Sequence, residues 1–329
     1  SPVSISIHTR FEDVSANFQS VSKLSLEQIT KKSKSMNERI TTSQDGESVA
    51  DGKLLYLAAF SNDPDGGNPA GVWIGKTLPS DKEMQRIAAE VGYSETAFVV
   101  PVNERELTIR FFSPESEVTF CGHATIATGV ALGKMHGDGI YRLGTLVGEV
   151  LVDVVTRDGV CEASLTSVKP DFELANTELV SEVLPLLGWM TTDLDRSIPP
   201  ARSFAGAWHL VIAVAEAERL ADLHYDFEGL KSLMLREGLT TLQLVWREDA
   251  GTFRSRNPFP VGGIVEDPAT GAAAAALGGY LREAKLLSAP STILIKQGDE
   301  IGRPSRLTVQ IPASGGIIVK GTAVSICAR

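Results

Sequence analysis

Three titratable side chains stand close to glycine-containing turns, where a folded chain can present reactive groups to a ligand. Glu95 follows a glycine by three positions and precedes an apolar segment, while His123 and Asp267 each lie near the start of a run of small residues. A carboxylate at the edge of a desolvated cleft suits general acid/base work, and an imidazole donates or relays a proton near neutral pH. These residues therefore indicate proton transfer on a small molecule.

Each of these side chains also has a plain structural interpretation. Glu95 suits an exposed helix–strand turn, and His123 suits a capped or core histidine. Asp267 suits the N-cap of a helix whose first residue is Pro268. Asn68, in a turn-rich loop, is placed either to bind a substrate or to make an Asx-turn. The residue types alone leave these alternatives open.

Two segments predict helices with almost no large side chains. One begins near Gly122 and continues to residue 132, and the other begins near Gly271 and continues to residue 281. A helix that is apolar on every side is surrounded by protein, and its N-terminus presents unpaired N–H groups and about half a positive charge. If both N-termini face one cleft, they bind a carboxylate from two sides. Otherwise the turns only admit the helices into tight cores.

The remaining pattern is one of short strands and few helices. Ser80 and Glu83 form a capping box, and apolar residues then recur at helical spacing up to Gly92, which predicts a helix over residues 81–91. A further helix is expected over residues 227–235. Strands are expected over residues 54–60, 71–75, 96–102, 107–112, 145–155, 160–166, 208–214, 241–246, 291–296, 306–311 and 316–320. Each half thus has strands plus one buried helix behind a glycine turn, which predicts two related domains that each wrap a sheet around a central helix.

The first 52 residues differ from the rest in composition. They are rich in Ser, Thr, Lys and Glu and have no sustained strand pattern, so we expect an extension of low order with no role in chemistry. Ser25 is placed to cap a short helix within it. The two domains are then expected over residues 53–172 and 173–315, and residues 316–329 are a candidate return strand to the first domain.

Bulk composition limits the kinds of partner and ligand that the protein is expected to bind. The chain has 329 residues and a formal net charge of −10, which argues against nucleic-acid and anionic-membrane surfaces but leaves room for a small anionic ligand. Cys121, Cys161 and Cys327 are too few and too scattered for a disulfide framework or a zinc site, so a reducing, cytoplasmic location is expected. No apolar stretch approaches the roughly 20 residues of a membrane span. No Walker loop, dinucleotide fingerprint or His/Cys cluster indicates a cofactor or a metal.

Several motifs in a fixed order resemble the phenazine-biosynthesis PhzF-like family over residues 53–329. They are Ala59-Phe60, Gly67-Asn68-Pro69-Ala70, Ser94-Glu95-Thr96-Ala97-Phe98-Val99, Arg110-Phe111-Phe112-Ser113-Pro114, Phe120-Cys121-Gly122-His123-Ala124-Thr125, Glu266-Asp267-Pro268-Ala269-Thr270-Gly271, and Gln297-Gly298 with Gly302-Arg303-Pro304-Ser305. The resemblance implies an α+β, diaminopimelate-epimerase-like fold, in which two similar domains, each a barrel-like and mostly antiparallel sheet around a central helix, enclose the site. It also implies a homodimer.

The resemblance further implies a reaction and the residues that perform it. In the founding members of the family, trans-2,3-dihydro-3-hydroxyanthranilate is isomerised by movement of a proton from carbon 3, without a cofactor. The glutamate that moves the proton corresponds to Glu95, and the histidine and aspartate that assist correspond to His123 and Asp267. The substrate-binding positions correspond to Asn68, Gly122, Thr270, Gly271 and Ala272.

One position departs from the family pattern. The second glycine turn usually continues with a serine whose hydroxyl contacts the substrate carboxylate, and Ala272 stands there in this chain. Related epimerases place one thiol in each domain, but here Thr270 occupies the position of the second, which disfavours a two-thiol racemase. We therefore expect a cofactor-independent isomerase of a small carboxylate. The alternatives are a catalytically silent binding or scaffold protein and, with less support, an amino-acid racemase or epimerase.

Treatment with a chelator should not lower turnover, because the expected chemistry uses only side chains that exchange protons. Exhaustive dialysis against EDTA should leave the isomerase rate undiminished, and the purified protein should show no visible-range absorption from a flavin or pyridoxal phosphate. Turnover that disappears on dialysis and returns with added metal would contradict this expectation.

Overall fold

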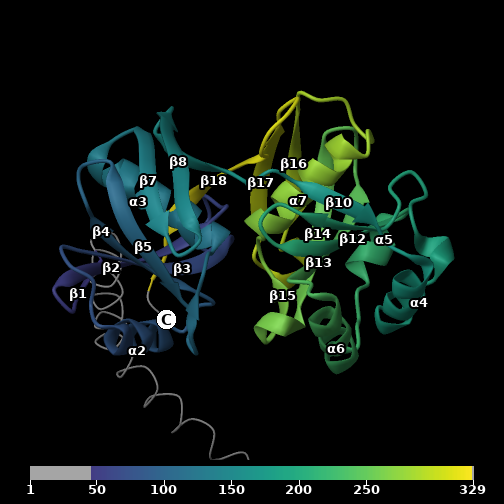
Figure 1. Cartoon of the computed structure of the whole chain (residues 1–329), viewed down its shortest axis with the longest axis horizontal. Helices are drawn as coiled ribbons and strands as arrows, with labels where there is room; N and C mark the ends of the chain where they lie inside the picture. The colour runs from purple at the N-terminus through teal and green to yellow at the C-terminus, as the bar shows by residue number, and fades with distance from the viewer. Residues whose placement is uncertain (1–45, 328–329) are drawn as a thin grey trace, which may run out of the picture.

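The computed structural model describes residues 46–327 and shows two lobes of strands, each around one long helix (Figure 1). The first lobe consists of β1 (Glu47–Val49), β2 (Gly52–Ala59), β3 (Asn68–Gly75), α2 (Asp81–Val91), β4 (Thr96–Pro101), β5 (Glu106–Phe112), β6 (Glu117–Val118), α3 (Gly122–His136), β7 (Gly139–Thr145), β8 (Gly148–Arg157) and β9 (Val160–Thr166). The second consists of β10 (Asp171–Leu174), α4 (Thr177–Leu186), β11 (Ala201–Phe204), β12 (Trp208–Val214), α5 (Ala217–Ala221), α6 (Phe227–Glu237), β13 (Thr241–Arg247), β14 (Thr252–Phe259), β15 (Ile264–Asp267), α7 (Gly271–Glu283), β16 (Ser291–Gln297) and β17 (Ser305–Ile311). The last strand, β18 (Ile318–Ser325), returns to the first lobe.

The strands of the first lobe close into a barrel around α3. Hydrogen-bonded neighbours follow the order β2, β3, β4, β5, β7, β8, β9 and β18, and β18 pairs again with β2. Most of these pairs are antiparallel, but β3 with β4 and β5 with β7 are parallel. Because these eight strands form a closed ring of pairings, the barrel surrounds α3 on every side.

The second lobe repeats this order of antiparallel and parallel pairings around α7. Its strands pair in the order β10, β11, β12, β13, β14, β16 and β17, and the two parallel pairs are β12 with β13 and β14 with β16. In each lobe a short strand and then the central helix connect the members of the second parallel pair, through β6 and α3 or through β15 and α7. The expected α+β architecture of two similar sheets around central helices is therefore confirmed.

Small residues allow the sheets to approach the central helices closely. Residues 123–133 of α3 and residues 273–281 of α7 are all buried. A Cβ added to Gly129 would lie 2.6 Å from Cγ1 of Val152 and 2.8 Å from Cβ of Ala163. Because these contacts are shorter than van der Waals distance, the barrel has its present diameter only with glycine at this position.

The N-terminal boundary of the first lobe differs from the expected one. β1 pairs antiparallel with β2 through a tight turn whose two central residues have positive φ, so residues 47–52 belong to the folded lobe and not to an extension of low order. Nε1 of Trp73 donates a hydrogen bond of 2.7 Å to the carbonyl oxygen of Val49. This strand therefore depends on a distant tryptophan, which its own short, polar sequence does not reveal. The helix expected to begin near Ser25 lies outside the described residues.

The helices at the periphery begin and end close to the expected residues. The hydroxyl of Ser80 accepts a hydrogen bond from the backbone N–H of Glu83 at the start of α2, and Gly92 ends the helix with φ of 67°. α6 covers the expected residues 227–235 and continues to Glu237. No helix within residues 46–327 is long and apolar enough to cross a membrane.

The start of α7 corrects one expectation. Asp267 is the last residue of β15, where it pairs with Asn257 of β14. The helix begins only at Gly271, with Thr270 at the N-cap, so the prediction that Asp267 caps a helix starting at Pro268 is wrong. Strand pairing fixes the backbone of Asp267 before the helix begins, and its carboxylate is left for other partners.

Gly129→Ala should destabilise the protein although alanine has the higher helix propensity. The gain in propensity is about 1 kcal/mol, whereas overpacking of a core typically costs about 1–3 kcal/mol. We therefore expect the free energy of unfolding, measured with urea, to fall by up to about 2 kcal/mol. A variant more stable than the parent would show that the barrel wall relaxes freely.

Candidate active site

A cleft of about 760 Å³ lies between the lobes and is lined by residues of both. The first lobe contributes Asn68, Pro69, Gly92, Tyr93, Ser94, Glu95, Ser113, Pro114, Glu115, Ser116 and Val118, and the second contributes Lys231, Phe259, Val261, Gly262, Gly263, Ile264, Glu266, Asp267 and Pro268. Three of the expected site residues, Asn68, Glu95 and Asp267, are therefore in the cleft wall. Four other cavities in residues 46–327, of about 260–420 Å³, are lined by none of these groups.

The N-termini of the two central helices meet next to this cleft. A Cβ on Gly122 would lie 3.8 Å from the backbone nitrogen of Ala272 and 3.8 Å from Cα of Gly271. The first N–H groups of both helices have no acceptor within their own helix. Gly122, Thr270, Gly271 and Ala272 are thus brought together at one junction, although none of them is in the cleft wall itself. This convergence is what binding of a carboxylate by two helix N-termini requires.

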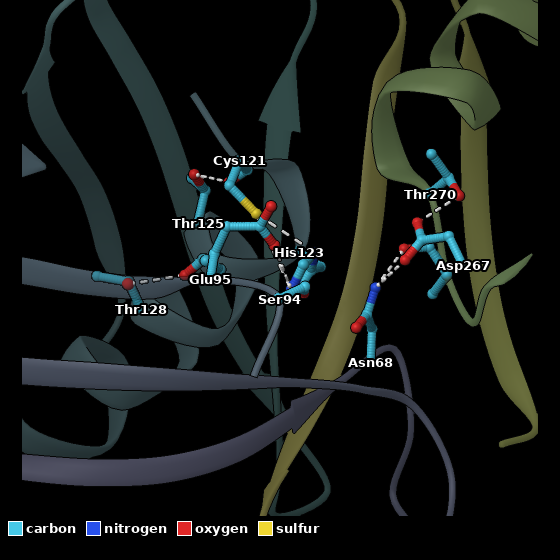
Figure 2. Close-up of polar contacts among 11 residues, drawn as sticks. Asn68, Ser94, Glu95, Cys121, His123, Thr125, Thr128, Asp267 and Thr270 are labelled. Atoms are coloured by element: carbon cyan, nitrogen blue, oxygen red, sulfur yellow. Dashed lines mark hydrogen bonds and ion pairs between the residues drawn. The ribbon is translucent and has the colours of Figure 1, made fainter. Parts of the chain in front are cut away.

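Glu95 lies in the turn between α2 and β4, and its side chain is 17% exposed. Its Oε2 is 3.5 Å from Nε2 of His123, the second residue of α3 (Figure 2). The hydroxyl of Ser94 is 3.4 Å from the same nitrogen. The carboxylate therefore faces both the cleft and an imidazole, so a proton on Glu95 has a neighbouring group that accepts or stabilises it.

Cys121 lies next to the same imidazole and close to Glu95. Its Sγ is 3.3 Å from Nδ1 of His123, and the residue is buried. Burial, helped by the negative charge of Glu95, raises the pKa of this thiol well above its usual value of 9.0, although a hydrogen bond from the Ala124 backbone opposes the rise. The thiol is therefore protonated near neutral pH. This state, together with Thr270 in place of a second cysteine, argues against racemisation by two thiols.

Asp267 faces this group from the second lobe. Its Oδ1 accepts a hydrogen bond of 2.8 Å from Nδ2 of Asn68, and its Oδ2 accepts one of 2.6 Å from the hydroxyl of Thr270 (Figure 2). Burial raises the pKa of Asp267 to about 6 and the charge of Glu95 adds to the rise, while His123 and the two hydrogen bonds oppose it. The carboxyl is therefore able to hold or release a proton near neutral pH.

Gln297 positions Asp267. The sequence analysis identified the Gln297-Gly298 motif but assigned no role to Gln297. Its Nε2 donates to the backbone oxygen of Asp267 at 2.8 Å and to the hydroxyl of Thr270 at 3.0 Å, while its Oε1 accepts from the backbone nitrogen of Thr270 at 3.1 Å. A Cβ on the following residue, Gly298, would lie 2.3 Å from the backbone oxygen of Arg303. The pair of residues thus locks the loop between β15 and α7.

A buried ion pair supports β15 from behind. Arg256 Nη2 lies 2.7 Å from Oε2 of Glu266, the neighbour of Asp267, and both side chains are almost fully buried. Arg256 Nη1 also donates to the backbone oxygens of Leu220 and Ala221 at the end of α5. Because removal of either partner would leave a buried charge unpaired, this contact strongly favours the present path of the strand. Sequence reasoning did not identify Arg256.

This arrangement of two strand-built lobes around central helices, with a cleft between them, is shared with proteins of known structure. A hydroxyproline epimerase from Agrobacterium vitis has this fold, with a TM-score of 0.57 at 14% identity over 83% of this chain and 90% of that one. The Bacillus anthracis phenazine biosynthesis protein of the PhzF family is more similar, with a TM-score of 0.73 at 26% identity over 83% of this chain and 96% of that one.

Sequence comparison identifies the family. Residues 57–329 match the family model described as phenazine biosynthesis-like protein, and the chain belongs to this PhzC-PhzF family. It is 32% identical to the trans-2,3-dihydro-3-hydroxyanthranilate isomerase of Pseudomonas aeruginosa, over 80% of this chain and 91% of the relative. The protein is therefore an isomerase of the PhzF type.

Asp267→Asn should change how stability depends on pH. The folded pKa of Asp267 is raised from 3.8 to about 6, so its contribution to stability is fully present below about pH 4 and is lost as pH rises through about 6. The contribution lost is about 3 kcal/mol. Urea unfolding of both proteins near pH 4 and near pH 7 should show the advantage of the parent over the variant shrinking with rising pH. An advantage that stays constant would contradict the assigned titration.

Proposed function

We propose that this protein isomerises a small carboxylate-bearing substrate by moving a proton between carbon atoms with Glu95. The observation that carries the proposal is that two carboxyl groups, Glu95 from the first lobe and Asp267 from the second, line the same cleft. A substrate bound there has a proton-transferring group on each side. The similarity to trans-2,3-dihydro-3-hydroxyanthranilate isomerases supports a cyclic amino acid of this type as the substrate.

The proposed step needs one base that also returns the proton. Glu95 in its ionised form takes a proton from a carbon next to the substrate's unsaturated system, and the electron pair moves along that system. Glu95 then gives the proton to a different carbon, so that atoms and charge balance. His123, 3.5 Å away, stabilises the carboxylate in the ionised state and receives the hydrogen bond when the carboxyl is protonated.

Asp267 and the helix N-termini hold the substrate in this proposal. With a pKa of about 6, Asp267 presents both protonation states near neutral pH and pairs with a polar substituent of the substrate. The first N–H groups of α3 and α7 bind the substrate carboxylate. Ala272 offers this carboxylate a backbone N–H and no hydroxyl, so recognition depends more heavily on the backbone than a serine at this position would allow.

The proposed reaction uses no resident cofactor. We also propose that the enzyme acts in the cytoplasm. Cys121, Cys161 and Cys327 are all free thiols, which suits a reducing compartment.

Glu95→Gln should lower turnover by about 10²–10⁴-fold while the fold stays intact, because the amide keeps the shape and loses the titrating group. The assay is isomerisation of trans-2,3-dihydro-3-hydroxyanthranilate, or exchange of the substrate's carbon-bound hydrogen in deuterated water. Glu115→Gln is the matched control, since Glu115 is an exposed carboxylate in the wall of the same cleft and should leave the rate nearly unchanged. A Glu95→Gln variant with normal turnover would remove the proposed base.

A further inference from the structure

Three different metal-binding side chains converge at the start of α3. Glu95, Cys121 and His123 each present one donor atom, and these atoms lie within 4.8 Å of one another. Nε2 of His123 is 3.5 Å from Oε2 of Glu95 and 3.9 Å from Sγ of Cys121. The thiol, the imidazole and the carboxylate thus form one cluster, whereas the proposed isomerisation uses only the last two.

The spacing of the three donors is close to that of a tetrahedral zinc site. With zinc–sulfur bonds of about 2.3 Å and zinc–nitrogen and zinc–oxygen bonds of about 2.0–2.2 Å, neighbouring ligand atoms are about 3.3–3.6 Å apart. The two separations from Nε2 of His123, 3.5 and 3.9 Å, are close to these values, and all three donor atoms lie within 4.8 Å of one another. We propose that Glu95, Cys121 and His123 bind Zn²⁺ or a similar thiophilic divalent cation, and that the bound ion inhibits the enzyme.

The donor set selects the kind of ion. Thiolate and imidazole ligands favour Zn²⁺, Co²⁺ and Cd²⁺, whereas Mg²⁺ and Ca²⁺ require oxygen ligands. On binding, the S–H bond of Cys121 breaks, its proton leaves to solvent and the metal–sulfur bond forms. Three protein ligands leave a fourth position open for water, because Glu95 lies at the wall of the cleft.

The charge of the cleft also favours a cation. Its lining carries four carboxyl groups, of which Glu266 is neutralised by Arg256 and the other three are on Glu95, Glu115 and Asp267, whereas Lys231 is the one cationic side chain among the lining residues. A divalent ion entering this space is therefore attracted toward the cluster. The sequence analysis weighed only the number and spacing of the cysteines. It therefore did not predict a metal site that Cys121 forms together with a glutamate and a histidine.

Inhibition follows from which groups the ion occupies. A metal bound to Glu95 and His123 takes the electron pairs that the carboxylate and imidazole use for proton transfer. This consequence rests on the proposed function, but binding of the ion does not. Metal binding is therefore measured separately from turnover. Absence of metal binding then contradicts the metal site alone, and absence of turnover contradicts the proposed reaction alone.

The test is titration of the metal-free full-length protein with Co²⁺, in a Cys327→Ser background that removes the exposed thiol. The protein should bind one ion per chain with a thiolate-to-cobalt absorption band, and Zn²⁺ but not Mg²⁺ should displace it. Cys121→Ser should abolish the band and weaken Zn²⁺ binding by about tenfold or more. Cys161→Ser is the matched control, because Cys161 is also a buried thiol of the first lobe but lies outside the cluster, and it should bind as the parent does.

A second variant keeps the proposal open to refutation if the serine variant fails to fold. Glu95→Gln should weaken Zn²⁺ binding by about tenfold while the thiolate band remains. In the parent, Zn²⁺ should inhibit turnover reversibly, with recovery on addition of EDTA. A thiolate band that survives in Cys121→Ser, the absence of any thiolate band in the parent, or displacement of Co²⁺ by Mg²⁺ would overturn the assignment.

Discussion

The whole arrangement depends on two buried helices whose N-termini abut. A Cβ on Gly122 would lie 3.8 Å from the backbone nitrogen of Ala272, which is ordinary van der Waals contact, so the two helix ends touch without overlap. Phe60 lies at the same junction. It is fully buried, a Cβ on Gly271 would lie 3.6 Å from its ring, and one on Gly321 would lie 2.2 Å from it. Gly321 therefore leaves the space that the Phe60 ring occupies at this junction.

Close packing at the junction also explains why the titratable groups differ in environment. Glu95 stands at the cleft wall beside His123, whereas Asp267 is buried between the lobes and pairs with Asn68. Burial sets the raised pKa of Asp267, and the positive charge of His123 opposes it. The two carboxyl groups thus occupy one cleft in different states of solvation, which is the condition under which one fold supports acid and base roles together.

Local sequence signals predicted the elements that are stable for local reasons. The capping box of α2, the small-residue helices α3 and α7 and the ordered motifs all depend on residues close in the chain. The expected strands do not include β1, β6, β7, β10, β11, β14 and β15, because most of these are short or polar and gain their stability from partner strands. The Asp267-Pro268 pair indicated a helix start, yet pairing with β14 prevailed. Cys121, His123 and Glu95 come together because the α2–β4 turn packs against the start of α3. The spacing of these residues along the chain does not predict this packing.

The path of β18 has a consequence for the order of assembly. Residues 318–322 pair with β9 and residues 323–325 pair with β2, so the barrel that begins the fold closes only with its last strand. The first lobe therefore lacks one strand of its barrel until residues 318–325 pair with it. Pairing between distant parts of a chain forms slowly, because loop closure costs entropy before the contact stabilises the fold. Residues 318–320 of β18 also pair with β17, so the strand that closes the first barrel joins the two lobes into one sheet.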